Sequence, residues 1–200
     1  MACLAAHAMS SFQILRSYLL QRAAITDAEF AAMEPFFAAR ALGPGDVLQR
    51  AGEPARWGAF VARGCLRRYA LDIDGGEHVV QFAPEEWWIS DLASLASGAP
   101  SHFFIDAIEA SDVLLITARD HKALLATMPG FAEAFRHGVQ ASVVAKDRRI
   151  VDTLSRSAEE RYEEFRRIYP SIAGRVPLKM LASYLGMTPE TLSRIRRPRR

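Results

Sequence analysis

Apolar residues follow two different periodicities along the chain, which divides it into a helical start, an extended middle and a helical end. At residues 11–22 they recur at helical spacing, and Thr26 with Glu29 forms a capping box ahead of a second short helix. Between residues 42 and 117 the apolar runs are short and separated by glycines. The pattern therefore predicts helices that flank a region of short strands.

Five extended runs are predicted in the middle of the chain. They are rich in Val, Ile, Phe and Tyr, and the central ones roughly alternate apolar and polar side chains. Asp74-Gly75, between two of these runs, is a strong hairpin signal. Many short strands with closely spaced turns are typical of an antiparallel sandwich or roll. The predicted strands are Trp57–Ala62, Cys65–Leu71, Glu77–Phe82, Phe103–Glu109 and Val113–Thr117.

After residue 117 the pattern returns to helix. Arg119–Met128 is predicted as one helix, and a long stretch without proline, Phe131–Leu154, follows it. Because a small domain has no need of so long a helix with a single apolar stripe, we interpret it as a connector that also forms a dimer seam. The alternative is a long helix packed on its own roll. The predicted seam residues are Phe135, Val139, Val143, Ile150 and Leu154.

Two short amphipathic helices are predicted between residues 178 and 197, after a helix at 158–169. The small Ala182 lets the two helices cross closely, and Gly186 supplies the left-handed residue that a sharp turn needs. Thr188 caps the second helix. A small residue, a glycine four positions later and apolar residues at fixed offsets form the pattern of a helix-turn-helix.

The outward face of the second helix is polar and rich in arginine. Arg194 can donate two hydrogen bonds to a guanine, and Glu190 can accept one from a cytosine amino group. The hydroxyl groups and the other arginines are suited to phosphate contacts that fix register. A purely structural helical hairpin needs no such face, so the pattern favours DNA binding. The predicted DNA-contacting residues are Thr188, Glu190, Thr191, Ser193, Arg194, Arg196 and Arg197.

Charge is distributed unevenly, although the formal net charge of the 200 residues is only +2. Residues 174–200 carry a net charge of +6, and residues 1–173 carry −4. Such a basic segment is typical of a chain with a polyanionic partner, because each Lys or Arg can displace a counterion from phosphate.

The composition excludes several classes of protein. Half of the residues are hydrophobic, which indicates a folded globular chain, and no apolar run approaches the ~20 residues that span a bilayer. We therefore expect a cytoplasmic protein without a membrane partner. Two cysteines cannot form a disulfide framework, and no histidine spacing is typical of a metal site, so no metal or cofactor is expected. Cys65 is expected to be a buried, inert thiol.

From about Ile25 to Arg197 the chain resembles the transcription regulators typified by the cyclic AMP receptor protein and the fumarate–nitrate regulator. The resemblance implies an α+β fold with an amino-terminal antiparallel β-roll, a jelly roll of the cyclic-nucleotide-binding type with flanking helices. A long dimerisation helix and a small all-α helix-turn-helix domain follow it. The implied domains span residues 1–128, 129–155 and 156–200. The segments that carry the resemblance are Pro44-Gly45-Asp46, Gly52, Gly64, Gly75-Gly76-Glu77, the long helix and residues 187–195.

The resemblance also implies a homodimer without catalytic activity that reads a palindromic operator in double-stranded DNA, with half-sites about 34 Å apart. The family's recognition helix has an Arg-Glu-Thr-x-x-Arg core. Glu190, Thr191 and Arg194 match it, but Pro189 replaces the first arginine, so the preferred site should differ there. The family continues into a β-hairpin wing, whereas this sequence stops at Arg200. The motif is therefore expected to be wingless, with terminal arginines that contact phosphate.

The sensor half departs from the family at the nucleotide pocket. Residues 88–92 replace a turn of the Phe-Gly-Glu-Leu type, and Ser101-His102 stands where an Arg-Ser pair would hold the cyclic phosphate. Because a buried phosphate without its arginine is poorly compensated, we expect no tight binding of cyclic AMP or cyclic GMP. A pocket for an unknown small-molecule effector is the prediction, with core packing as the alternative. Its candidate residues are Trp88, Ser90, Asp91 and His102.

Two other functions stay open on the sequence. One is a cupin-like enzyme built on the β-roll, against which the missing metal triad counts. The other is a binding module whose helix-turn-helix contacts proteins, which the missing wing and the missing first arginine allow. The leading prediction is a homodimeric transcription regulator under the control of an unknown effector, with RNA polymerase left open as a further partner.

Overall fold

The computed structural model describes residues 2–197, and for residues 2–10 it describes the backbone alone. The helices in this part of the chain are α1 (Ala2–Leu20), α2 (Asp27–Met33), the 3-10 turn η1 (Glu34–Phe36), α3 (Leu92–Ser97), α4 (Ala118–Thr127), α5 (Pro129–Ser155), α6 (Ala158–Ile168), α7 (Leu178–Leu185) and α8 (Pro189–Arg196). The strands are β1 (Ala38–Leu42), β2 (Val47–Gln49), β3 (Trp57–Arg63), β4 (Leu66–Leu71), β5 (Glu77–Ala83), β6 (Trp88–Ile89), β7 (Phe104–Ala107) and β8 (Ser111–Thr117).

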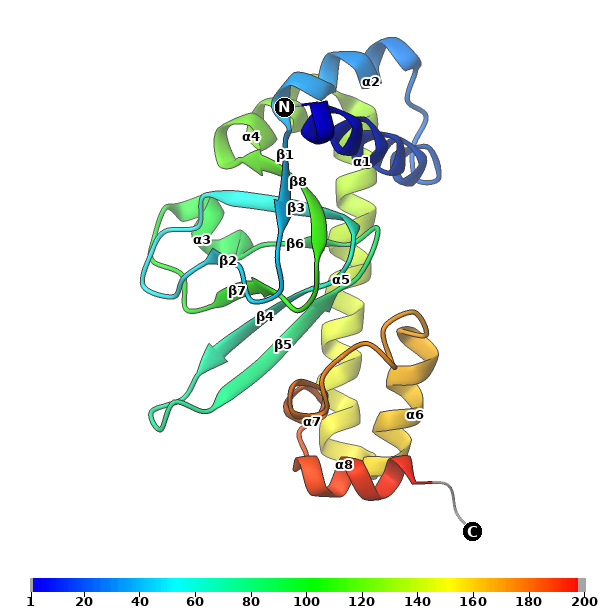
Figure 1. The fold of residues 1–200 in the computed structure, drawn as a ribbon. Coiled ribbons are helices and arrows are strands. Elements are labelled where there is room, and N and C mark those ends of the chain that lie inside the picture. The colour runs from blue at the N-terminus through cyan, green and yellow to red at the C-terminus, as the bar shows by residue number, and fades with distance from the viewer. Residues whose placement is uncertain (1, 198–200) are drawn as a thin grey trace.

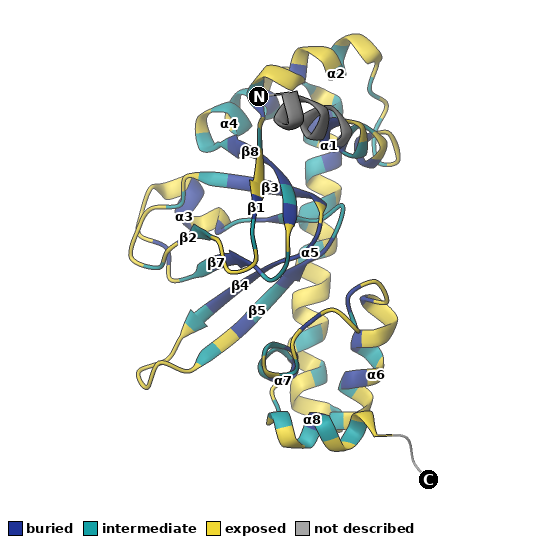
Figure 2. Cartoon of the chain, viewed as in Figure 1, coloured by how far each residue is buried: buried dark blue, intermediate teal, exposed yellow. Residues whose placement is uncertain are grey.

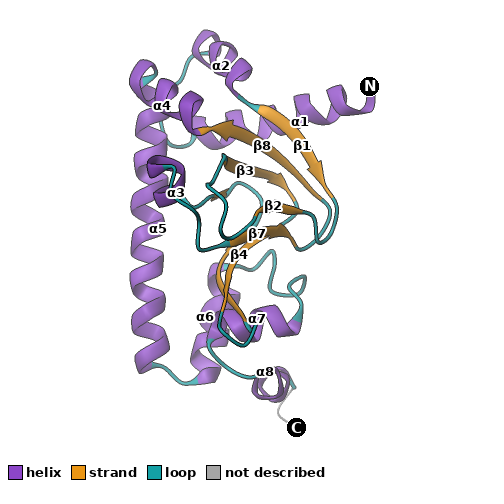
Figure 3. Cartoon of the chain, turned by 90° about the vertical axis from the view of Figure 1, so that its left-hand side faces the viewer, coloured by secondary structure: helices purple, strands orange, loops and turns teal. Residues whose placement is uncertain are grey.

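The strands form two antiparallel sheets of four strands each, with the orders β1-β8-β3-β6 and β2-β7-β4-β5. Alternate side chains of both sheets meet in a shared core that includes Val61, Leu66, Ile105 and Val113. Figure 3 shows the strands gathered beside the long helix α5. The structure therefore confirms the predicted antiparallel roll and the mixed α+β class.

The five predicted strands are present, but three strands and one helix were missed. Four of the five β1 side chains are exposed or only partly buried, and β2 and β6 contain three and two residues. Such short or exposed segments carry no apolar alternation for sequence reasoning to detect. Helix α3, with six residues, follows the Asp91 cap. These missed elements close the edges of the roll.

Helices α1, α4 and the start of α5 cover the outer face of the sheet that contains β3 and β8 (Figure 1). Their apolar side chains form one cluster with this sheet, in which Leu15, Leu124 and Phe131 pack with Phe60 and Leu114. Thr26 forms the predicted capping box with Glu29 at the start of α2. The predicted flanking helices therefore bury a second hydrophobic core outside the roll.

Helix α5 runs along the whole molecule (Figure 1), and its 27 residues correspond to about 40 Å. Its first turns are buried against the roll through Phe131 and Ala134. Its second half carries large apolar side chains that solvent reaches, with Leu154 83% exposed (Figure 2). We call this surface the α5 strip, which consists of Val143, Val144, Ile150, Val151 and Leu154.

The carboxy-terminal helices pack against the roll, a contact that the sequence did not predict. The Ser183 hydroxyl on α7 donates to the Glu77 carbonyl oxygen at 2.6 Å and accepts from the Val79 backbone N–H at 2.9 Å. Arg175 forms ion pairs with Glu85, at 2.7 Å, and with Glu109. Phe82 of β5, Phe165 of α6 and other aromatic side chains fill the space between the two parts. The roll and the helical end therefore share one core.

Candidate nucleic-acid interface and effector cavity

Helices α7 and α8 form the predicted helix-turn-helix. Gly186 ends α7 with a φ of +65°, the left-handed conformation that glycine adopts without steric cost. The Thr188 side chain accepts from the Thr191 backbone N–H at 3.2 Å and so caps α8. Ala182 and Leu192 are fully buried where the two helices pack together. The local sequence alone specifies this geometry.

Helix α8 lies at the end of the molecule farthest from α1 and α2 (Figures 1 and 3). Of the residues predicted to contact DNA, Thr191 and Ser193 are partly buried. The terminal residues Pro198, Arg199 and Arg200, which we expected to contact phosphate, lie outside the described residues. The other predicted contacts are exposed, and they are Thr188, Glu190, Arg194, Arg196 and Arg197.

The predicted seam on α5 divides into two parts. Phe135 packs against the His121 ring, with 4.5 Å between ring centroids, and Val139 lines a cavity. Val143, Ile150 and Leu154 are exposed. Sequence reasoning missed Val144 and Val151, which are also exposed, because a single stripe at helical spacing does not include them. The exposed apolar surface therefore lies on the second half of the helix.

A cavity of about 660 Å³ lies between the roll and α5. Its walls come from α1, β3, β4, β5, β6, β8, α3, α4 and α5, so residues far apart in sequence meet there. Trp88, Ser90 and Asp91 line it, as predicted for the effector pocket. His102 is exposed on a loop and is not among the described residues that line the cavity. The structure thus brings together three of the four candidate residues.

The Asp91 and Ser101 side chains bind each other. The Ser101 hydroxyl donates to Asp91 Oδ2 at 2.8 Å, and Asp91 Oδ1 accepts from the Ser94 backbone N–H at 3.3 Å. Both side chains are buried. The Asp91 carboxylate therefore already has two donors from the protein itself, as the N-cap of α3.

Sequence reasoning missed three cationic residues that line the same cavity. Arg68 comes from β4, Lys146 from α5, and Arg22 from the loop after α1, where its guanidinium lies 3.7 Å from the centre of the Tyr18 ring. One signal was present, because consecutive arginines on a strand, Arg67 and Arg68, must point to opposite faces. The cavity therefore contains cations that sequence reasoning did not predict.

Comparison with solved structures identifies the fold. FixK2 from Bradyrhizobium japonicum has a TM-score of 0.68 and 19% identity, covering 80% of this chain and 82% of its own. A Eubacterium rectale protein assigned to the Crp/Fnr family has a TM-score of 0.66 and 16% identity, covering 86% and 82%. The c-di-GMP-responsive regulator CLP from Xanthomonas campestris has a TM-score of 0.67 and 15% identity, covering 84% and 89%.

The chain has the Crp/Fnr fold. The likeness is one of structure, because no protein-family model and no curated protein matches the sequence. The roll, the long helix and the two terminal short helices occur here in the order that the resemblance implied.

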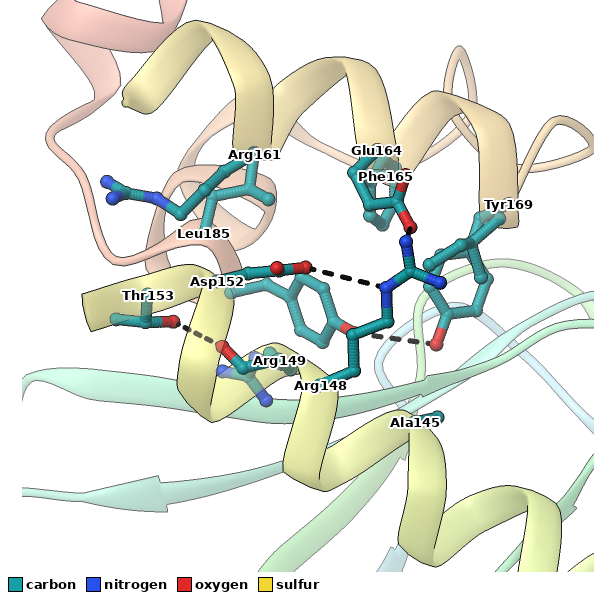
Figure 4. Close-up of a pocket in the computed structure, with 12 residues that line it drawn as sticks. Ala145, Arg148, Arg149, Asp152, Thr153, Arg161, Glu164, Phe165, Tyr169 and Leu185 are labelled. Carbon is teal, nitrogen blue, oxygen red and sulfur yellow. Dashed lines mark hydrogen bonds and ion pairs between the residues drawn. The ribbon is translucent and has the colours of Figure 1, made fainter. Parts of the chain in front are cut away.

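The corner between α5 and α6 contains a second, smaller hollow (Figure 4). Arg148 contacts Glu164 at 2.8 Å and Asp152 at 4.0 Å, and the Arg161 Nε is buried without an acceptor among the described residues. The Arg167 side chain lowers the pKa of Glu164 to about 2. With about 60 Å³, the hollow has room for a few water molecules and not for an effector.

Three further expectations concern chemistry elsewhere in the chain. Cys65 is fully buried, and burial raises the pKa of its thiol to about 12, so the thiol stays protonated at neutral pH. Among the described residues, no group of three or more His, Cys, Asp or Glu side chains could hold a metal ion. In the same part of the chain, no helix has both the length and the apolar character that crossing a membrane requires.

Proposed function

We propose that this chain is a transcription regulator that binds double-stranded DNA as a homodimer and responds to a small-molecule effector other than cyclic AMP. The observation that carries the proposal is the exposed, arginine-rich face of α8 on a helix-turn-helix, within a Crp/Fnr fold. The solved structures with this fold include proteins described as regulators, such as CLP. Binding to DNA, rather than catalysis, is then the activity of the chain.

The exposed side chains of α8 divide by their chemistry. In the major groove, Arg194 reads a guanine through its O6 and N7 atoms, and Glu190 accepts from a cytosine amino group. Ser193, Arg196 and Arg197 contact phosphates and set the register of the helix. Thr188 offers its hydroxyl to phosphate as well as capping the helix, and Thr191 lies beside it. The proposed contacts are therefore Thr188, Glu190, Thr191, Ser193, Arg194, Arg196 and Arg197.

The α5 strip supports the proposed homodimer. Five large apolar side chains on one half of a helix are unfavourable in water, and a second α5 would bury them in a coiled-coil-like contact. A two-fold axis along this contact would present two α8 helices to successive major grooves, about 34 Å apart. We propose that α5 at 129–155 joins a sensor domain at 1–128 to a DNA-binding domain at 156–200. Such a role implies RNA polymerase as a further partner and the cytoplasm as the location.

Selection of bound duplexes from a random pool, carried out with the purified full chain, tests DNA binding and the homodimer together. We expect a palindromic motif with half-sites about one helical turn apart, and an affinity that falls steeply as salt rises. Recovery of no sequence motif above background, or binding that salt does not weaken, would refute the proposal and leave protein interaction as the use of the helix-turn-helix.

Sedimentation of an α5 variant tests the homodimer separately. Ile150→Glu places a charge in the α5 strip and should convert the dimer to monomer, because a carboxylate is costly in an apolar contact. Ile73→Glu is the matched control, since Ile73 is fully exposed at the tip of the β4–β5 hairpin, outside α5. A monomeric wild-type chain, or a dimer that Ile150→Glu leaves intact, would exclude this seam.

A further inference from the structure

The cavity between the roll and α5 contains a buried cation with an unused hydrogen-bond donor. Arg68 is only 9% exposed and lines the cavity. Its Nη1 donates to the Ser90 carbonyl oxygen at 2.7 Å, but its Nε is buried and has no acceptor among the described residues. A buried N–H of a charged group without an acceptor is unfavourable, so such groups in folded proteins call for a partner.

The neighbouring Arg67 shows which kind of partner is missing. On the opposite face of β4, the Arg67 Nε and Nη2 donate to the two carboxylate oxygens of Asp106 at 2.8 and 2.9 Å. This parallel pair of bonds is the preferred geometry between a guanidinium and a carboxylate. In Arg68 the Nε on the corresponding edge has no acceptor among the described residues. A ligand carboxylate in the cavity would give the Arg68 guanidinium, which lines that cavity, the kind of partner that Asp106 gives Arg67.

A second cation lies at the same cavity. Lys146 projects from α5, is exposed, and forms no ion pair among the described residues. Partial burial of its ammonium group and the positive charge of Arg68 lower its pKa. Burial also lowers the pKa of Arg68, against the opposing effect of Asp91. Two cations that destabilise each other beside an open volume form a binding site for an anion, because one bound anion relieves both.

The acidic residues of the cavity leave this demand unmet. Asp91 is engaged by Ser94 and Ser101, as described above. The other carboxylate, Glu86, forms no ion pair with Arg68 or Lys146 among the described contacts. The remaining wall is largely apolar and includes Trp87, Trp88, Leu95, Ile116, Phe135 and Val139. The cavity therefore combines one cationic region with a wide apolar region, within the size range of small-molecule sites.

We propose that this cavity binds a small amphipathic carboxylate, with its carboxylate group on Arg68 and Lys146 and its apolar, preferably aromatic, body against Trp88 and Phe135. The inference deepens the effector role in the proposed function and rests on that function for its regulatory meaning. Binding itself does not depend on DNA. Val139 and Val143 belong both to the wall of the cavity and to α5, so a ligand there touches the helix that carries the proposed dimer seam.

Isothermal titration of the full-length protein, without DNA, tests the proposal with pairs of probes that differ only in charge. The probes are 1-naphthylacetate and 3-phenylpropanoate, each compared with its uncharged amide. We expect at least one acid to bind with a Kd below 1 mM and at least fivefold tighter than its amide. Arg68→Met should remove this preference, and Lys146→Met should reduce it at least twofold.

The exposed arginine of strand β1 provides the matched control, and Arg40→Met should keep the full preference for the acid. Lys146→Met replaces a side chain outside the hydrophobic cores, so it keeps the test decisive if Arg68→Met fails to fold. Failure of both acids to bind at 1 mM, a preference below fivefold in the wild type, a preference that survives in a folded Arg68→Met variant, or one that Lys146→Met reduces by less than twofold overturns the proposal. Because duplex binding is measured separately, such a failure leaves the proposed DNA-binding function standing.

Discussion

Arg67 and Arg68 are neighbours on β4, yet the two faces of the strand use them in opposite ways. Arg67 is paired on all sides, with Asp106 at 2.8 Å and Glu77 at 2.5 Å, and its guanidinium lies 4.1 Å from the Tyr69 ring centre. Arg68 donates to one carbonyl oxygen, and its guanidinium lies 4.8 Å from the Phe103 ring centre. It lines a cavity, and its Nε is buried without an acceptor among the described residues. The arginine on the outer face is thus paired with carboxylates, whereas the arginine on the inner face has no carboxylate partner among the described residues.

The same contrast distinguishes the two arginines of the helical end. Arg175 is tied to Glu85 and Glu109 and holds the carboxy-terminal helices on the roll. Arg194 is exposed on α8. Arginines that carboxylates of the chain satisfy stabilise the fold, and those that the chain leaves unsatisfied are available to a ligand or to DNA. This distinction leads to four predictions, ordered by the size of the expected effect.

The largest effect is expected where the pair is complete. Arg67→Met should lower the free energy of unfolding by about 3–5 kcal/mol, because it leaves the buried Asp106 carboxylate without its partner. Urea denaturation of the purified protein measures this loss. The double variant Arg67→Met/Asp106→Leu removes both charges and should recover most of it. A loss below about 1 kcal/mol in the single variant would mean that the pair is not structural.

A smaller effect, on binding and not on stability, is expected at α8. Arg194→Ala should weaken binding to the selected duplex by about 1–3 kcal/mol and relax the preference at one base pair of each half-site. Competition binding against duplexes substituted at each position measures it. Arg119→Ala, at an exposed arginine of α4, removes the same charge at the other end of the molecule and should change nothing. Equal weakening on every sequence would make Arg194 a phosphate contact.

Arg68→Met should have the smallest effect on the free energy of unfolding, and the small size of this effect is the sharpest test of the comparison. The variant loses the bond to Ser90 but also removes a buried N–H without an acceptor, so the unfolding free energy should change by less than about 1 kcal/mol. Urea denaturation without added carboxylates measures it beside Arg67→Met. A loss as large as that of Arg67→Met would show that Arg68 has a protein partner in solution.

The last prediction concerns pH and Glu164, a carboxylate whose charge is already satisfied. The hydrogen bond from Arg167 and the charges of Arg148 and Arg156 lower its pKa from 4.5 to about 2. The folded pKa is depressed, so the contribution to stability is complete above pH 4.5 and is lost as the pH falls toward 2. An NMR titration should find the carboxylate ionised at pH 3, and Arg167→Met should raise its pKa. An ordinary titration in the wild type would contradict the ion cluster.

The two candidate sites differ in how far the sequence predicted them. The α8 interface lies within ten consecutive residues, 188–197, and its signals, the Gly186 turn and the Thr188 cap, are local, so the prediction and the structure agree on its geometry. The cavity draws Arg68 from a strand and Lys146 from a helix 78 positions further along the chain. No spacing rule links such residues. His102, which was a candidate because of its position in the family resemblance, is exposed on a loop and is not among the described residues that line the cavity.

The sequence by itself determined the succession of helical start, strand-rich middle and helical end, the helix-turn-helix and the cationic character of residues 174–200, because periodicity, capping and glycine turns act over a few residues. Only the tertiary structure decided that Ser183 and Arg175 dock the terminal helices on the roll, and that one of two adjacent arginines faces a cavity without a carboxylate. These outcomes depend on which distant groups meet inside the fold. Packing and charge satisfaction between such groups cannot be read from neighbouring positions in the chain.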